Sequence, residues 1–265
     1  MDRKMNTSLN IGKIAWFALA WWLGLTFSGR SSIRAQEKGR AAGNAVGIFE
    51  GHGDVGKVLH AGTVEYDAGK QTYTVEGSGE NIWFAKDEFQ FAWKKMSGDL
   101  TLTADVLFTT KGGNEHKKAV LMIRQSLDAD SAYADIALHG NGMTSLQYRN
   151  DAGAQTQEIQ ASVNAPQRVR LEKRGDHFSM WLADENGRFQ PATGSARVVL
   201  KEPFYVGIGM CSHDENAVEK AVFSKVELRS KPQTASVDGR VDAMKKETGE
   251  RETGWEAGQG GRLQS

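Results

Sequence analysis

The chain has 265 residues with 33 basic and 33 acidic side chains, and only one cysteine. This balance argues against a protein that binds nucleic acid or anionic membranes, because both partners require a basic surface. The single cysteine, Cys211, cannot form an internal disulfide, and its apolar neighbours in the sequence predict a small buried hydrophobic residue.

Residues 1–35 have the pattern of a secretory signal peptide. Basic residues precede an apolar run of about fourteen residues, Ile14–Phe27, and Ala35 offers a small residue for cleavage. A relaxed transmembrane helix needs about 20 residues, so the run is short for a span, and an uncleaved anchor is the alternative. We expect an exported protein, periplasmic or extracellular, without membrane contact after cleavage. Removing five basic residues and one acidic residue would leave 28 basic against 32 acidic side chains.

The rest of the chain divides by composition into three parts. Residues 36–54 are rich in glycine, alanine and charge, which is typical of a linker. Residues 230–265 are polar and lack apolar periodicity, so we expect a mostly disordered tail. The predicted folded domain lies between them and spans residues 55–229.

Within this domain, short runs of alternating apolar and polar residues are separated by turns rich in glycine, asparagine and aspartate. The strongest run is Leu100–Phe108, with five apolar residues at a period of two. The other predicted strands are Thr63–Tyr66, Gln71–Glu76, Phe89–Lys94, Ala119–Arg124, Tyr133–His139, Thr144–Arg149, Gln155–Gln160, Arg168–Arg174, His177–Leu182, Ala196–Leu200, Phe204–Ser212 and Val222–Leu228. Such a series predicts an all-β, two-sheet antiparallel sandwich, in which each strand has one solvated face.

Catalytic motifs do not emerge from the sequence. Glycoside hydrolysis needs two opposed carboxyl groups, yet acidic pairs such as Asp184 and Glu185 are adjacent and would point to opposite faces of a strand. There is no nucleophile elbow. Cys211 and His213 are two residues apart and would share a strand face, so a Cys/His dyad is the alternative to a buried thiol. We therefore predict no catalytic residues.

Metal ligands are equally sparse. The six histidines are scattered along the chain, which argues against zinc. Asp128 and Asp130, with Asp135 beyond them, could supply oxygen ligands for calcium, although the segment lacks the glycine and terminal glutamate of an EF-hand loop. A solvated turn is the alternative. We expect no cofactor and leave calcium open.

Aromatic and polar residues on neighbouring predicted strands are the candidates for ligand binding. Aromatic rings can stack on sugars, and a few polar groups then fix the orientation. The candidates are Trp93, Tyr148, Trp181, Arg124, Gln125 and Arg149. If Arg124 is buried it must be paired, with Asp135 or another carboxylate; the alternative places the tryptophans in the core and the arginines on the outer face. Lys117 and Lys118 are predicted to be a solvated strand start.

Several segments resemble a bacterial domain family of unknown function within the concanavalin A-like lectin/glucanase superfamily. The resemblance spans residues 85–228 and is carried by Asp87–Val106, Lys118–Ser131, Leu146–Arg149, Ala165–Leu171 and Tyr205–His213. It implies a two-sheet jelly-roll with a concave face. Relatives occur alone, or attached to glycan-active enzymes and to Tol-type biopolymer transport proteins, and the family has no agreed catalytic residues.

From this resemblance we expect an exported, non-catalytic recognition module that binds a carbohydrate or another envelope polymer on its concave sheet. The first alternative is a structural or protein-interaction component of a Tol-like envelope assembly, so a protein partner stays open. The second is a glycoside hydrolase of the same superfamily. Nucleic acid is not an expected partner.

Overall fold

The computed structural model describes residues 45–230. Every secondary-structure element named in this range, β1 to β16, is a β-strand. No segment of this range is a helix long and apolar enough to cross a bilayer. The predicted signal peptide, residues 36–44 of the predicted linker and residues 231–265 of the predicted tail lie outside the described residues.

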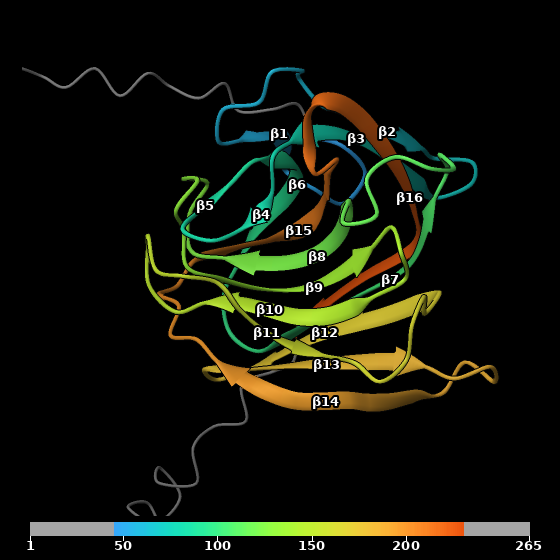
Figure 1. Ribbon diagram of the computed structural model, residues 1–265. Coiled ribbons are helices and arrows are strands. Elements are labelled where there is room, and N and C mark those ends of the chain that lie inside the picture. The colour runs from blue at the N-terminus through green and yellow to red at the C-terminus, as the bar shows by residue number, and fades with distance from the viewer. Residues whose placement is uncertain (1–44, 231–265) are drawn as a thin grey trace, which may run out of the picture. The chain divides into compact units, whose positions relative to one another are not determined.

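Fourteen strands form two seven-stranded antiparallel sheets that pack face to face (Figure 1). The sheet named here the β8 sheet contains, in spatial order, β1 (Gly51–Val55), β6 (Phe89–Met96), β15 (Phe204–Cys211), β8 (Lys118–Arg124), β9 (Tyr133–His139), β10 (Thr144–Arg149) and β11 (Gln157–Gln160). The β7 sheet contains β14 (Phe189–Arg197), β13 (His177–Ala183), β12 (Arg168–Arg174), β7 (Leu100–Phe108), β16 (Asp214–Ser230), β3 (Thr72–Gly79) and β2 (Thr63–Asp67). A small hairpin joins β4 (Ile82–Trp83) to β5 (Lys86–Asp87).

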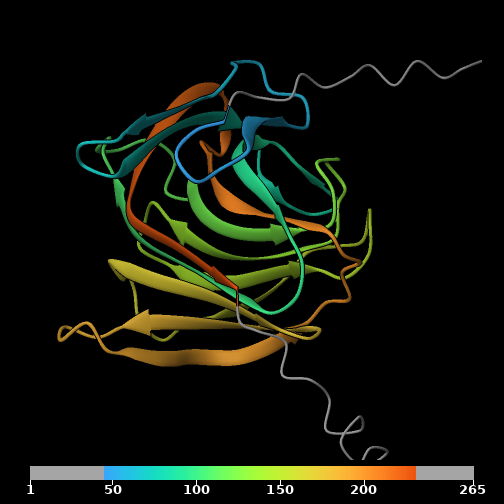
Figure 2. The ribbon, with the colours of Figure 1, turned by 180° about the vertical axis from the view of Figure 1, so that it is seen from behind.

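The chain crosses repeatedly between the sheets. Strands β6 and β7 are consecutive in sequence but belong to different sheets, as do β14 and β15 (Figure 2). Strand β15 returns to lie between β6 and β8, and β16 lies between β7 and β3. The predicted all-β, two-sheet antiparallel jelly-roll sandwich is confirmed.

The main core fills the space between the two sheets. Leu100, Leu102 and Ala104 of β7 are fully buried and face Leu121 and Ile136 of the β8 sheet across this layer. Complete burial of such side chains contributes roughly 1.5–3 kcal/mol for each leucine or isoleucine, so the alternation seen in the sequence directly builds the sandwich.

Some strand bounds differ from the predicted ones. Strand β1 uses residues 51–54, which the composition assigned to the linker, because its glycine-rich backbone pairs with β6 without needing an apolar pattern. Strand β14 ends at Arg197 instead of running over 196–200, and it begins at Phe189. It tolerates Pro191 because it lies at a sheet edge, where a missing N–H is harmless.

The outer face of the β8 sheet, turned away from the β7 sheet, is buried at its centre rather than solvated. Every residue of β8 and β9 is buried, so both faces of these strands are covered. The outer face carries a second apolar cluster, formed by Val55, Ile82, Phe89, Phe91, Trp93, Val120, Met122, Tyr133, Ala137 and Cys211. One of its members, Ile82, belongs to the β4–β5 hairpin, which therefore packs over this face.

Candidate ligand-binding site

The strand register brings polar side chains together on the outer face of the β8 sheet. Asp135 of β9 pairs with Met122 of β8 and with Gln147 of β10, and Gln147 pairs with Glu158 of β11. Residues paired directly across antiparallel strands share a face. These four side chains therefore form one row, two carboxyl groups separated by an amide.

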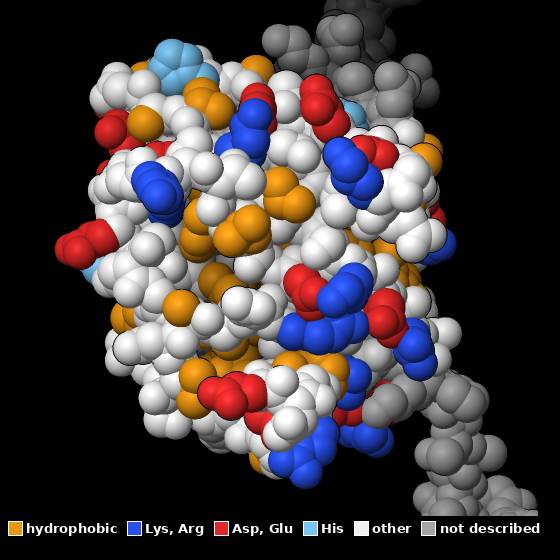
Figure 3. Space-filling view, turned by 90° about the vertical axis from the view of Figure 1, so that its right-hand side faces the viewer, with side chains coloured by type: hydrophobic (Ala, Val, Ile, Leu, Met, Phe, Trp, Pro, Cys, Tyr) orange, Lys and Arg blue, Asp and Glu red, His pale blue; other side chains and the backbone are white. Residues whose placement is uncertain are grey.

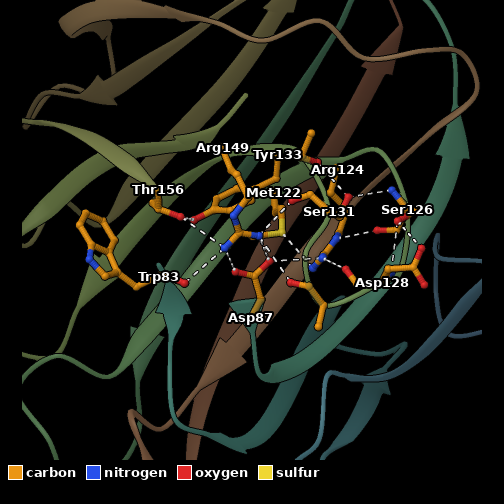
Figure 4. A network of polar contacts seen from close by, with 12 residues as sticks. Trp83, Asp87, Met122, Arg124, Ser126, Asp128, Ser131, Tyr133, Arg149 and Thr156 are labelled. Atoms are coloured by element: carbon orange, nitrogen blue, oxygen red, sulfur yellow. Dashed lines mark hydrogen bonds and ion pairs between the residues drawn. The ribbon is translucent and has the colours of Figure 1, made fainter. Parts of the chain in front are cut away.

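Two buried arginines beside this row share one carboxylate, that of Asp87 at the end of β5. Asp87 accepts hydrogen bonds from Arg124 Nη2 at 3.3 Å and from Arg149 Nη1 and Nη2 at 2.9 and 2.7 Å. All three side chains are fully buried. Figure 4 shows Asp87 between the two guanidinium groups. Burial raises the pKa of Asp87, and the two arginines oppose this shift.

The same arginines also bind main-chain carbonyl groups around them. Arg124 donates to the carbonyl oxygens of Ser126 and Asp128, and Arg149 donates to those of Phe84 and Ser131. Phe84 lies in the turn of the β4–β5 hairpin. The arginine–Asp87 cluster, named here the clamp, thus fixes the hairpin to the β8 sheet.

The clamp contains two of the predicted ligand-binding residues, Arg124 and Arg149. Arg124 and Arg149 do lie on the outer face, but they have no exposed surface and are occupied by Asp87 and carbonyl oxygens. The expectation that a buried Arg124 is paired with Asp135 or another carboxylate is confirmed, and the carboxylate is that of Asp87. Their place in the fold is structural, as supports of the hairpin.

Next to the clamp, the outer face is hollowed into a pocket of about 260 Å³. We identify this face with the predicted concave face. Its lining combines strand residues with residues of the hairpin and neighbouring loops: Lys118, His139, Gln147, Glu158, Asn81, Trp83, His116, Met143 and His213.

Lys118 connects the sheet to the hairpin at this pocket. Its ammonium group donates to Asn81 Oδ1 at 2.7 Å and to the Ile82 carbonyl oxygen at 2.8 Å, and it lies 5.3 Å from the centre of the Trp83 ring. Burial lowers the pKa of Lys118. The predicted solvated start of this strand was wrong, because Lys117 is also buried and pairs with Glu219 at 3.0 Å.

Several buried polar atoms at and beside the pocket have no hydrogen-bond partner in the described part of the chain. They are both carboxyl oxygens of Asp135, Gln147 Oε1, Glu158 Oε2 and His213 Nδ1. Asp135 is fully buried, and burial raises the pKa of its carboxyl well above the ordinary value, although Lys118, Arg124 and Arg149 oppose this. Buried polar groups are usually satisfied, so this concentration marks a place where water or a ligand can supply the missing partners.

Three histidine rings lie around the pocket. The ring of His116 is 6.2 Å from that of His139 and 5.6 Å from that of His213, measured between centroids. Burial lowers the pKa of His139 to about 4 and also lowers that of His213. Both rings are therefore neutral at pH 7.

Over residues 45–230, no three His, Cys, Asp or Glu side chains are grouped so that they could hold a metal ion. In the predicted calcium segment, Asp128 Oδ2 accepts a hydrogen bond from Ser126 Oγ, and the Asp128 carbonyl accepts one from Arg124. No ligand role of Asp128 and Asp130 follows from these contacts, and calcium binding stays a prediction.

The remaining predicted ligand residues lie elsewhere. Gln125 binds the main chain of Lys201, and Trp93 packs in the outer cluster beside Phe91 and Tyr205. Tyr148 packs against the main core, because it alternates with Gln147 and Arg149 and so points to the opposite face.

Trp181 belongs to β13 in the β7 sheet, where it pairs with Arg170 and Pro191. It is therefore not on the sheet that carries the pocket. Among the predicted ligand residues, none lines the pocket. Alternation alone does not tell which of the two sheets a strand enters, and this is why Trp181 was grouped with residues of the other sheet.

The alternative of a Cys211–His213 dyad is not supported by the geometry. Cys211 is fully buried in the outer cluster and donates to the Gly79 carbonyl oxygen, while its sulfur accepts from the His213 main-chain N–H. Burial raises the pKa of the Cys211 thiol to about 12. A thiol that stays protonated at neutral pH is not a nucleophile, so the prediction of a buried hydrophobic cysteine is confirmed.

Lys118, His139 and Glu158 were missed as candidate site residues, although one signal pointed to Lys118. On β8, Lys118 and Arg124 share a face with apolar Val120 and Met122 between them. A strand face that is charged at both ends and apolar in the middle indicates buried and paired charges, not a solvated strand start.

No family model matches the chain, and no curated protein matches it in sequence. Several solved structures are similar to it in fold. A functionally unknown protein from Saccharomyces cerevisiae is 16% identical, with a TM-score of 0.51 over 68% of this chain and 97% of that chain. A Lotus tetragonolobus seed lectin is 7% identical, with a TM-score of 0.44 over 66% of this chain and 93% of that one.

A family 7 alginate lyase, A1-II′, is 8% identical, with a TM-score of 0.44 over 65% of this chain and 83% of that chain. At such identities the likeness concerns the fold alone. The predicted bacterial family and its Tol association stay predictions.

Proposed function

We propose that this chain is a carbohydrate-binding protein whose ligand enters the pocket on the outer face of the β8 sheet. One observation carries the proposal: the pocket sets the Trp83 ring beside buried polar atoms of Gln147 and Glu158 that lack partners. An apolar ring beside a few convergent polar groups is the usual composition of a small-molecule site. Sugars fit this composition, because their C–H faces stack on rings and their hydroxyl groups bind polar atoms.

The size of the pocket is consistent with a small part of a glycan. Its volume of about 260 Å³ lies just below the range of roughly 300–1,000 Å³ that holds drug-sized ligands. It therefore suits one end group or a short segment. The other sugar units of a polymer would extend over the rim formed by the hairpin.

Titration calorimetry of the purified protein against a panel of neutral and acidic oligosaccharides tests this proposal. We expect Trp83→Ala to weaken binding by about ten-fold, the value of a lost stacking contact worth roughly 1.4 kcal/mol. Trp181→Ala is the matched control, because it removes the same residue type from the other sheet and should leave the affinity unchanged. Failure of every glycan to bind, or equal effects of the two variants, would reject the proposal.

A role as a structural or protein-interaction component, including a Tol-like assembly, is the second candidate. It is favoured by an apolar groove of about 390 Å³, lined in part by Val106, Leu107, Phe108 and Pro166. Leu107 is 65% exposed. Figure 3 shows hydrophobic side chains in the middle of one flank of the sandwich, with basic and acidic side chains next to each other around them. If Leu107→Asp abolishes capture of a specific partner and Trp83→Ala does not, this candidate replaces the first.

A glycoside hydrolase is the third candidate, favoured by the row that contains Asp135 and Glu158. Their strands are two apart and their side chains share a face, so the Cα atoms lie roughly 10 Å from each other. Inverting enzymes hold their two carboxyl groups about 6.5–9.5 Å apart. Against it, Asp135 has no exposed surface with which to reach a bound sugar. We therefore propose a non-catalytic protein. Release of reducing ends from any panel glycan, lost in Glu158→Gln, would overturn this.

We also propose that the protein is exported, on the pattern of residues 1–35. Cell fractionation and N-terminal sequencing of the accumulated protein test this. A mature N-terminus immediately after Ala35 is the expected result, and a protein that keeps Met1 inside the cell would contradict it.

A further inference from the structure

The partnerless atoms at the pocket share one chemical character. Gln147 Oε1 and Glu158 Oε2 are both buried oxygen atoms. The amide oxygen of Gln147 accepts hydrogen bonds and cannot donate them, and the same is true of an ionised Glu158 carboxylate. The amide nitrogen of Gln147 already donates one of its two hydrogens, to Ser145 Oγ at 3.2 Å. A ligand that satisfies these oxygens must supply hydrogen-bond donors, as sugar hydroxyl groups do.

The cation at the pocket is already bound by the protein. Lys118 donates to Asn81 Oδ1 and to the Ile82 carbonyl oxygen, and its ammonium group also lies near the face of the Trp83 ring. Arg124 and Arg149 are fully buried and hold Asp87. An incoming carboxylate would have to displace these contacts to gain a cationic partner.

Two of the three imidazoles at the pocket, those of His139 and His213, add no positive charge that would offset Glu158. His139 is neutral at pH 7 because burial lowers its pKa to about 4, and burial also lowers the pKa of His213. Glu158 lines the same pocket and carries a buried oxygen without a partner. A second carboxylate placed beside it would be repelled, and burial weakens the screening of that repulsion.

We propose that the pocket binds uncharged, hydroxyl-rich sugars and discriminates against uronic acids. This inference rests on the proposed function and specifies its ligand class. Neutral hexose units give the donors that Gln147 and Glu158 lack, whereas oxidation of C6 to a carboxylate replaces a donor by a charged acceptor next to Glu158. The discrimination thus comes from the pocket's own acceptors as well as from its charge.

Matched oligosaccharides that differ only at C6 test this inference. The probes are β-1,4-mannohexaose against the β-1,4-mannuronate hexamer, and cellohexaose against the β-1,4-glucuronate hexamer. We expect the neutral member of a pair to bind and the uronate member to bind about ten-fold more weakly or not at all, the effect of one uncompensated charge contact. Titration calorimetry at pH 7 and moderate salt measures both.

Glu158→Gln identifies the origin of the discrimination. It keeps the shape and one acceptor oxygen but removes the charge, so the preference for the neutral member should shrink several-fold while the variant still binds it. Gln157→Glu is the control: it adds a charge on the same strand outside the pocket lining, its carboxylate still accepts a hydrogen bond from the Tyr148 hydroxyl, and the preference should persist.

The outcomes separate the two proposals. If a uronate binds as tightly as its neutral counterpart, or if Glu158→Gln leaves the preference unchanged, the inference on ligand class is wrong and carbohydrate binding stands. If no glycan of either kind binds, the proposed function itself fails and this inference fails with it.

Discussion

Replacing Asp135 by asparagine should stabilise the folded protein at neutral pH, and the gain should grow as the pH rises. Neither carboxyl oxygen of Asp135 receives a hydrogen bond among the described residues, and the side chain has no exposed surface. Asparagine has nearly the same shape, needs no ionisation, and brings an amide that can donate to Gln147 Oε1 across the strand pair.

The size of the effect follows from the raised pKa of Asp135. Between the ordinary value of 3.8 and the higher value in the folded state, the folded chain holds a proton that the unfolded chain has released. The free energy of unfolding of the wild-type protein therefore falls as the pH rises, by about 1.4 kcal/mol per pH unit inside that window. Asparagine at position 135 removes this loss, because it does not titrate.

Urea unfolding of both proteins at pH 4.5, 5.5 and 6.5, followed by tryptophan fluorescence, measures the difference at each pH. Because His139 titrates in both proteins, its opposite contribution cancels in the difference. Asp67→Asn is the control: a main-chain hydrogen bond from Lys70 lowers the pKa of Asp67, so its effect belongs below pH 3.8 and the difference should stay flat. A flat difference for Asp135→Asn as well would show that the three neighbouring cations keep Asp135 ionised, and would refute the reasoning.

Three further predictions follow from single contacts. Asp87→Asn should lower the free energy of unfolding by about 3 kcal/mol in urea, because breaking a buried ion pair leaves two guanidinium groups without a carboxylate; a loss below 1 kcal/mol would contradict this. Gly207→Ala should cost about 1–3 kcal/mol, since its Cβ would overlap the Ala92 carbonyl oxygen, whereas Gly194→Ala, with nothing within 4 Å of its Cβ, should be neutral in thermal unfolding. Cys211 should resist a maleimide reagent at pH 8 until the protein is unfolded, given a thiol pKa of about 12; rapid labelling of the folded protein would contradict this.

The sandwich could be predicted because apolar and polar residues alternate along most of its strands. Tyr133–His139 and Thr144–Arg149 have the predicted bounds, and both are inner strands of the β8 sheet, with a neighbour on each side. Strand β1 carries no such pattern, since Val55 is the one apolar side chain among its five residues and the rest of the strand contributes backbone pairing at an edge. Period-two patterns report which side chains are buried, so elements that are held mainly by backbone bonds escape them.

The candidate site escaped prediction for a different reason. Its rim depends on a hairpin whose two strands have only two residues each, too short for any periodicity. Asp87 is therefore not recognisable as the partner of two arginines that lie 37 and 62 residues later in the chain. Sequence could indicate that Arg124 needed a carboxylate, but only the fold identifies which one.

The hairpin links the stability of the clamp to the affinity of the pocket. Asp87 at its end neutralises Arg124 and Arg149, while Asn81 and Trp83 at its start contact Lys118 and line the pocket. A hairpin that detaches part of the time lowers the fraction of protein able to bind, and the apparent dissociation constant rises by the inverse of that fraction. Asp87→Asn should therefore weaken glycan binding although Asp87 does not line the pocket, and the loss should be smaller at low temperature, where the hairpin stays docked. Unchanged affinity in a folded but destabilised Asp87→Asn protein would show that the pocket keeps its shape without the Asp87 carboxylate.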